Sequence, residues 1–392
     1  MAQPGSQSAL RPELGPLIAD IQSRGLAIEL AGETTRVGGA GPSDASMISI
    51  EGVYITAPVG AGFVNDSPYA LRQDGGGNWA VFKGMERVAS AEVAARPKFY
   101  DMVTDDGIPY WKIALLHLDS LASTVVQKCA YWDTADQCKF CGIELSLASG
   151  NTIPAKRPEH LAEVAVAAKE LDGAVDITLT TGSTYGPDKG ALYLGRCAEA
   201  MHGATGLPVE AQFEPPDDLD TINTVHDMGV GGVGIHVESF DPATLADIAP
   251  PKARTGIEGY FTAWERAVDV FGEGQVSTYV ILGMGEDPDL TVEGCKRAID
   301  MGVYPFIVPL RPVPGSLLEN LRPPDSAYTE GIYRRVVPYL VERGIGSWTV
   351  SAGCARCQAC SGMSLFEKEY MDLASPSNSD RTRIPVRSVN QS

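Results

Sequence analysis

Two patterns of hydrophobic and polar positions divide the chain near residue 115. Beyond it, short apolar runs rich in β-branched residues alternate with longer stretches in which apolar residues recur at helical spacing. The short runs predict six strands, at Ala114–Val126, Ala174–Thr180, Pro208–Phe213, Gly232–Val237, Gln275–Leu282 and Pro305–Leu310. The longer stretches predict helices at Pro158–Leu171, Gly190–His202, Leu219–Met228, Gly259–Phe271, Leu290–Met301 and Ser326–Arg343.

This alternation predicts the fold class of residues 116–345. Parallel strands need a crossover, usually a helix, so six β/α repeats favour a parallel sheet. Right-handed crossovers curl such a sheet into a partial (β/α)6 TIM-like barrel, in which function gathers at the carboxyl ends of the strands. An open doubly wound sheet is the alternative.

The flanking segments follow other patterns. Residues 1–115 predict a small mixed α/β accessory domain, with an amphipathic helix at Leu10–Arg24 and strands at Met47–Thr56 and Trp79–Phe82. Its glycine-rich segments lie at 36–44 and 73–78, and the first lacks the Lys-Ser/Thr ending of a P-loop. Residues 346–374 form a Cys-rich extension, and the polar tail 375–392 is expected to be disordered.

Composition narrows the range of partners. The chain has 392 residues and a formal net charge of −19, which argues against nucleic acid or an anionic membrane as a partner. We find no secretory signal and no apolar run of the roughly 20 residues that cross a bilayer. We therefore expect a cytoplasmic protein, in whose reducing surroundings closely spaced cysteines indicate metal or redox chemistry.

Six of the eight cysteines fall into two groups of three. The first trio is Cys129, Cys138 and Cys141, which follows the first predicted barrel strand. Three thiolates hold three irons of a 4Fe–4S cluster and leave the fourth iron open to a chelating ligand. The alternative is a structural zinc loop with His117 or Asp119 as its fourth ligand.

The first trio, with Phe140 inside its CKFC ending, resembles the cluster loop of the radical S-adenosylmethionine (SAM) superfamily. Eight residues separate the first two cysteines here, whereas three is the commonest spacing in the superfamily. Later segments are similar to further superfamily motifs. Thr181–Gly182–Ser183 stands where a Gly-Gly-Glu run is frequent, VILGMGED contains Gly283 and Gly285 near the expected adenine, and PLRPVPGS is similar to a stretch of biotin-synthase-like members.

The resemblance implies a mechanism and a set of cofactors. A three-cysteine 4Fe–4S cluster would bind SAM and cleave it reductively to a 5′-deoxyadenosyl radical, which abstracts hydrogen from a small-molecule substrate. A reductant such as flavodoxin or ferredoxin would supply the electron. Sulfur insertion, as in biotin and lipoyl synthases, is one reaction of this kind. The layout is also similar to a radical SAM subgroup associated with nitrilase gene clusters.

The second trio comprises Cys354, Cys357 and Cys360, with the first spacings of a bacterial ferredoxin run. It predicts an auxiliary 4Fe–4S cluster that relays electrons, anchors a substrate or donates sulfur; a zinc site is the alternative. The remaining cysteines, Cys197 and Cys295, lie in predicted helices and are expected to be buried hydrophobes or a remote fourth ligand.

Charged and polar residues at the strand ends complete the candidate site. Glu238 is expected to contact the ribose or methionine part of SAM, and Arg311 to pair with a carboxylate. Glu214, His236 and Glu286 lie at similar positions, where a solvated rim charge or a structural role is the alternative. Two other classes of protein stay open: a non-catalytic zinc-binding scaffold, and an iron–sulfur electron-transfer protein.

Overall fold

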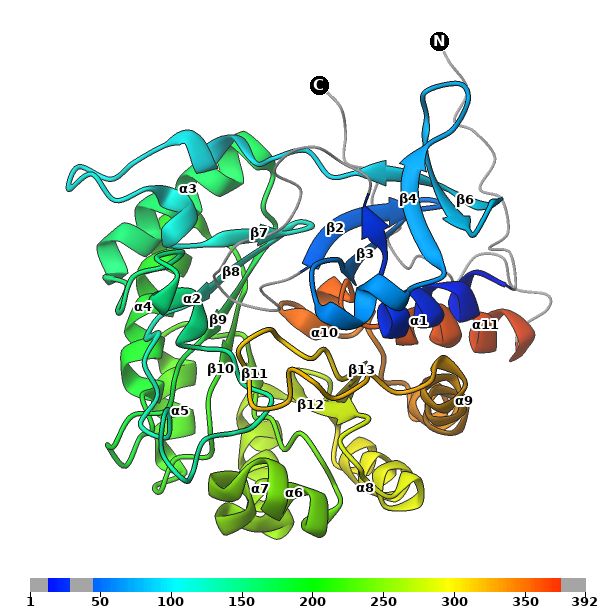
Figure 1. The fold of residues 1–392 in the computed structure, drawn as a ribbon. Helices are drawn as coiled ribbons and strands as arrows, with labels where there is room; N and C mark the ends of the chain where they lie inside the picture. Colours follow the sequence, from blue (N-terminus) through cyan, green and yellow to red (C-terminus); the bar gives the residue numbers. More distant parts are fainter. Residues whose placement is uncertain (1–12, 29–44, 375–392) are drawn as a thin grey trace.

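The computed structural model describes residues 13–28 and 45–374 (Figure 1). Its larger sheet has seven strands in the order β13-β12-β11-β10-β9-β8-β7. The strands are β7 (Leu115–His117), β8 (Ser120–Thr124), β9 (Asp176–Thr180), β10 (Val209–Gln212), β11 (Gly232–Gly234), β12 (Val276–Leu282) and β13 (Val303–Pro309). From β8 to β13 all neighbours are parallel and follow chain order. This order confirms the partial barrel, because a doubly wound sheet reverses its strand order.

The first predicted strand differs from the observed structure. Instead of one strand from Ala114 to Val126, the chain forms the antiparallel hairpin β7–β8, whose turn includes Leu118 at φ 58°. The continuous apolar run hid this turn, because a leucine seldom adopts positive φ.

Helices surround the convex face of the curled sheet (Figure 1). The predicted ones are confirmed as α3 (Pro158–Asp172), α4 (Ala191–Thr205), α5 (Asp220–Asp227), α7 (Pro250–Phe271), α8 (Pro288–Asp300) and α9 (Ser326–Glu342). The structure adds α2 (Leu145–Ala148) and α6 (Pro242–Ile248). In addition, α7 begins at Pro250 rather than Gly259, with a kink at Gly256. Proline is favoured in the first turn of a helix, so Pro250 and Pro251 begin α7 and do not interrupt it.

A second sheet lies beside β13 and α9 (Figure 1). It has six strands in the order β1-β4-β5-β6-β2-β3. They are β1 (Ala27–Ile28), β2 (Ala45–Ile50), β3 (Val53–Pro58), β4 (Tyr69–Gln73), β5 (Trp79–Lys83) and β6 (Glu86–Val93), so the run predicted as one strand at Met47–Thr56 is a hairpin. Helix α1 (Leu14–Arg24) shares a hydrophobic cluster with this sheet. Short 3-10 helices η1 (Gly62–Asp66), η2 (Lys98–Asp101) and η3 (Tyr110–Lys112) follow.

The C-terminal segment joins the two sheets. It contains α10 (Cys354–Cys357) and α11 (Met363–Ala374). Phe366 of α11 packs in the barrel core, while its neighbour Leu365 packs against the cluster of the N-terminal sheet. The expected domain boundaries stay predictions, and the segments 36–44 and 375–392 lie outside the described residues.

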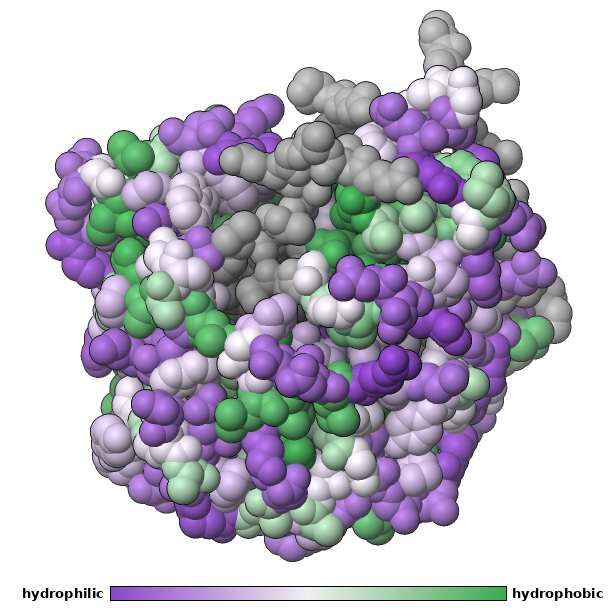
Figure 2. All heavy atoms as spheres, in the orientation of Figure 1, coloured by the Kyte–Doolittle hydropathy of each residue, from purple (hydrophilic) through white to green (hydrophobic). Residues whose placement is uncertain are grey.

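Hydrophobic residues on the face drawn in Figure 2 form small groups among hydrophilic ones. None of the helices in the described ranges is long and apolar enough to cross a membrane.

Candidate functional site

The first cysteine trio lies on the loop that follows β8, at the carboxyl end of the barrel's first parallel strand. The segment that follows β9 forms two backbone hydrogen bonds with this loop. The N–H of Gly182 donates to the Val126 carbonyl at 2.8 Å, and the N–H of Ala130 donates to the Ser183 carbonyl at 2.7 Å. A Cβ on Gly182 would lie 2.1 Å from the Lys128 carbonyl oxygen. Only glycine therefore allows the Thr-Gly-Ser segment this close to the cysteine loop.

The three thiols are half-buried and interact electrostatically with one another. Burial raises the pKa of all three, that of Cys141 to about 12, while backbone amides oppose the rise at Cys129 and Cys141. Such thiols stay protonated unless a cation holds the thiolate form. Their surroundings therefore disfavour a free thiolate nucleophile.

A buried ion pair lies beside this trio. Lys252 Nζ contacts Glu238 Oε1 at 3.1 Å and donates to the His236 carbonyl at 2.5 Å. Both side chains are about a tenth exposed, and each interacts electrostatically with Cys138. Glu238 has φ 70°, a conformation that costs a non-glycine residue energy and is common at functional sites. The structure thus places Glu238 and Lys252 near the cysteine loop, and a contact of Glu238 with SAM stays a prediction.

The other predicted rim residues differ in their surroundings. Glu214 accepts from the Tyr131 hydroxyl at 3.2 Å in the cysteine loop. His236 is buried, which lowers its pKa to about 3, and its Nδ1 accepts from the Tyr279 backbone at 3.1 Å. Glu286 binds the backbone N–H groups of Gly283 and Met284, both at 2.7 Å. These contacts support the local backbone, and a contact of His236 or Glu286 with a ligand stays a prediction.

The glycines of the VILGMGED segment form a strained turn after β12. Gly283 and Gly285 have φ 94° and 103°. A Cβ on Gly283 would meet Pro324 at 2.6 Å, whereas the space around Gly285 is open. The turn needs its first glycine for packing and positive φ. Contact of either glycine with adenine stays a prediction, as does a SAM contact by Thr181, Gly182 or Ser183.

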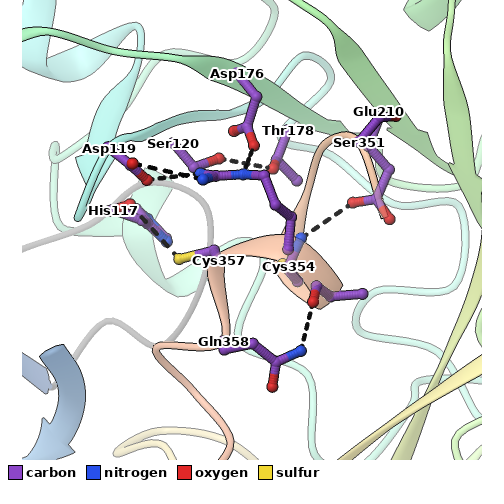
Figure 3. Close-up of polar contacts among 12 residues, drawn as sticks. His117, Asp119, Ser120, Asp176, Thr178, Glu210, Ser351, Cys354, Cys357 and Gln358 are labelled. Atoms are coloured by element: carbon purple, nitrogen blue, oxygen red, sulfur yellow. Dashed lines mark hydrogen bonds and ion pairs between the residues drawn. The ribbon is translucent and has the colours of Figure 1, made fainter. Parts of the chain in front are cut away.

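The segment of the second trio lies at the amino-terminal ends of β8 and β9, where Arg356 pairs with Asp119 and Asp176. Figure 3 shows Cys354 and Cys357 near these carboxylates. The Cys354 backbone donates to Glu210 of β10 at 3.3 Å, and Cys357 Sγ lies 3.6 Å from the His117 carbonyl of β7. Cys360 Sγ lies 3.8 Å from the hydroxyl of Thr56, on strand β3 of the N-terminal sheet. The second trio is therefore enclosed by both sheets.

Arg356, inside the second trio, fixes this segment to the barrel. It contacts Asp119 at 2.6 Å and also pairs with Asp176 of β9, which is fully buried. His117, the last residue of β7, and Asp119, in the hairpin turn, thus contact the segment of the second trio. These contacts do not favour the alternative in which one of them is a zinc ligand of the first trio.

A cavity of about 320 Å³ has one cysteine of each trio in its lining. These two cysteines are Cys141 and Cys360. Arg311 also lines it, and its Nη2 donates to the Thr56 carbonyl at 2.5 Å. The structure therefore places Arg311 between the barrel and the N-terminal sheet, at the cavity wall.

The thiol geometry bears on which metal group fits. Across residues 13–28 and 45–374, no three His, Cys, Asp or Glu side chains gather closely enough to hold one metal ion. The first trio lies on a loop, whereas Cys354 and Cys357 of the second trio are the end residues of α10. The choice between a cluster and a single zinc ion at either trio stays a prediction. Cys197 and Cys295 are fully buried in α4 and α8, as expected of hydrophobes.

Several residues of the site were not predicted. Lys252, Glu210 and Thr56 come from α7, β10 and the N-terminal sheet, and only the folded chain brings them to the cysteines. For Glu210, a usable signal existed: a charged residue in the middle of an apolar strand indicates an inward-facing polar group.

Comparisons with known proteins give partial matches. No protein-family profile matches the chain. Bacteriochlorophyllide c C-7(1)-hydroxylase of Chlorobaculum limnaeum is 31% identical over 122 residues, which are 31% of this chain and 30% of that protein. The chain thus spans less than a third of this curated relative.

Solved structures give weaker similarities. A radical SAM methyltransferase from Sphaerobacter thermophilus matches with TM-score 0.44 and 15% identity, over 71% of this chain and 76% of that one. Methylornithine synthase matches with TM-score 0.43 and 17% identity, over 56% and 62%. The FeFe-hydrogenase maturase HydG of Carboxydothermus hydrogenoformans matches with TM-score 0.41 and 18% identity, over 57% and 52%.

Proposed function

We propose that this protein is a radical SAM enzyme that acts on a small molecule inside its barrel. The observation that carries the proposal is the position of the first trio: three half-buried thiols on the loop after the first parallel strand, beside a cavity in the barrel. In β/α barrels this end of the sheet holds the functional groups. The sequence motif and the fold thus point to the same place.

Cys129, Cys138 and Cys141 would hold a 4Fe–4S cluster with one open iron. When bound, this cluster and SAM together supply a 5′-deoxyadenosyl radical for hydrogen abstraction. The protein's residues orient and shield these groups. Gly182 lets the β9 backbone support the cysteine loop, and Glu238, held by Lys252, is placed to accept hydrogen bonds from the hydroxyl or ammonium groups of SAM.

Cys354, Cys357 and Cys360 would hold a second 4Fe–4S cluster at the far end of the cavity. Its enclosure by two sheets limits access of water, which helps to set a cluster potential. Sulfur insertion, in which such a cluster is consumed, is one reaction open to this arrangement. We further propose a cytoplasmic setting with a flavodoxin or ferredoxin as reductant.

The test is reductive SAM cleavage by anaerobically reconstituted protein. We expect brown protein with about eight irons per chain. With SAM and dithionite it should form 5′-deoxyadenosine. Cys141→Ala should abolish that product, because the first cluster loses a ligand, whereas Cys357→Ala should still form it. Cys295→Ala, which removes a buried thiol in α8, is the matched control.

Two outcomes would contradict the proposal. Colourless protein that carries zinc would favour the zinc-binding scaffold. Iron-loaded protein that never forms 5′-deoxyadenosine would favour the electron-transfer protein.

A further inference from the structure

We propose that the cavity between the two cysteine trios binds a small organic carboxylate, with Arg311 as its anchor. The inference rests on the proposed function in one respect: the bound carboxylate would be the substrate of that chemistry. The binding itself depends only on the cavity and its charge.

The cavity has the size and lining of a small-molecule site. Its volume of about 320 Å³ lies at the lower end of the range for ligand pockets. Its apolar wall includes Phe140, Ile281 and Leu310, and its hydroxyl groups belong to Thr124, Thr180 and Tyr279. Such a lining suits a molecule with an apolar body and a few polar groups.

The charge of the lining has one sign. Arg311 is the one charged side chain among the described residues that line the cavity, apart from the thiols; aspartate, glutamate and lysine do not contribute to that lining. The whole chain, in contrast, carries 50 acidic and 31 basic residues. A lone cation in the interior of so acidic a protein favours an anionic occupant.

Arg311 is held in place but only partly satisfied. Its Nη2 donates to the Thr56 carbonyl at 2.5 Å, which fixes the plane of the guanidinium. Its Nη1 is buried and has no hydrogen-bond partner within the described residues. No ion pair within those ranges includes Arg311. The guanidinium is therefore a positive charge at the cavity wall that no carboxylate of the described lining neutralises, and a bound carboxylate would gain from that charge.

A second, half-buried arginine shows the contrast. Arg356, which lies between Cys354 and Cys357, pairs with both Asp119 and Asp176. The fold thus supplies carboxylates to one arginine near the second trio and leaves the other facing the cavity. A guanidinium offers parallel N–H groups that match a carboxylate, and the apolar wall favours a carbon chain over a bare phosphate.

The experiment measures binding of hexanoate and its neutral analogue hexanamide to the reconstituted protein by calorimetry. Wild type should bind hexanoate at least tenfold more tightly than hexanamide. Arg311→Gln should reduce this ratio to near one, and Arg311→Lys should keep part of it because the charge remains. Arg335→Gln, which removes an arginine on the surface of α9, is the matched control and should keep the full ratio.

Three results would overturn the inference: equal binding of hexanoate and hexanamide in wild type, an undiminished ratio in Arg311→Gln, or competition by inorganic phosphate as strong as that by hexanoate. Loss of iron from Arg311→Gln without any carboxylate preference in wild type would instead make Arg311 a partner of the second cluster.

The same preparations separate this inference from the proposed function. If the protein forms 5′-deoxyadenosine but binds hexanoate and hexanamide equally, only the inference about Arg311 is wrong. If it prefers hexanoate but forms no 5′-deoxyadenosine, only the proposed function is wrong.

Discussion

Lys156 is a cation buried among neutral partners, next to the cysteine loop. It is 1% exposed and donates to Gln127 at 3.0 Å and to Thr152 at 2.7 Å. Gln127 in turn donates to the Ile143 carbonyl at 2.7 Å, two residues beyond the first trio. Burial lowers the pKa of Lys156 from 10.5 to about 7. Lys156 therefore supports the loop of the first trio through Gln127, and its burial disfavours the charged form of its own side chain.

A pH dependence of stability follows from this lowered pKa. Between pH 7 and 10.5 the unfolded chain binds a proton at Lys156 that the folded chain lacks, so the free energy of unfolding rises with pH. From pH 7.5 to 9.5, wild type should gain about 2 kcal/mol relative to Lys156→Met in urea unfolding. Lys296→Met, on the surface, should follow wild type; parallel pH curves for wild type and Lys156→Met would contradict the argument.

At the scale of elements, each of the two cysteine sites contains one glycine that a neighbouring segment approaches closely. Gly182 lets β9 approach the first trio, as described above, while Gly353 precedes α10 with φ 90°. A Cβ on Gly353 would lie 1.9 Å from Glu210 Oε2. Each glycine is therefore required by a close approach at one site only.

Replacement of either glycine by alanine should remove iron from its own cysteine site and leave the other site loaded. Gly182→Ala forces the first cysteine loop away from β9, so iron should fall from about eight to about four per chain and 5′-deoxyadenosine should be lost. Gly353→Ala should lose a similar amount of iron and keep 5′-deoxyadenosine. Gly203→Ala in α4, where a Cβ meets nothing, should keep all the iron. The prediction is wrong if both variants lose the same activity.

The hydrophobic pattern predicted the barrel because its strands appear as short apolar runs and its helices as apolar residues at helical spacing, with polar residues between them. It missed what depends on single backbone conformations: the turn at Leu118, and the start of α7 at Pro250. The two groups of cysteines are evident from their spacing, and their role as ligands stays a prediction. Their partners could not be predicted, since Lys252 approaches Cys138 from α7 and Thr56 approaches Cys360 from 304 positions away in the chain.

At the scale of the whole molecule, Asp20 joins three elements. It accepts from Tyr69 of β4 at 2.6 Å, from Ser326 of α9 at 2.7 Å and from Arg24 of its own helix at 2.8 Å. The contact with Ser326 connects the N-terminal sheet's helix to the barrel. The N-terminal part and the barrel are thus in contact through the Asp20 carboxylate as well as through Thr56.

Removal of this carboxylate should loosen the N-terminal sheet from the barrel. Asp20→Ala leaves partly buried hydroxyl donors without their acceptor, so the free energy of unfolding should fall by about 1–3 kcal/mol in urea. Asp269→Ala, on an exposed position of α7, should change it little. A loss no greater in Asp20→Ala than in Asp269→Ala would show that the junction does not depend on Asp20.

The Thr56 backbone N–H donates to the Ala359 carbonyl at 2.7 Å, so an early strand closes against one of the last segments of the described chain. During synthesis the barrel strands leave the ribosome well before residues 354–360 do. The nascent barrel therefore stays open at its amino-terminal end until residues 354–360 have been synthesised. If the second trio takes up iron and sulfide, its three thiols can do so together only after that point.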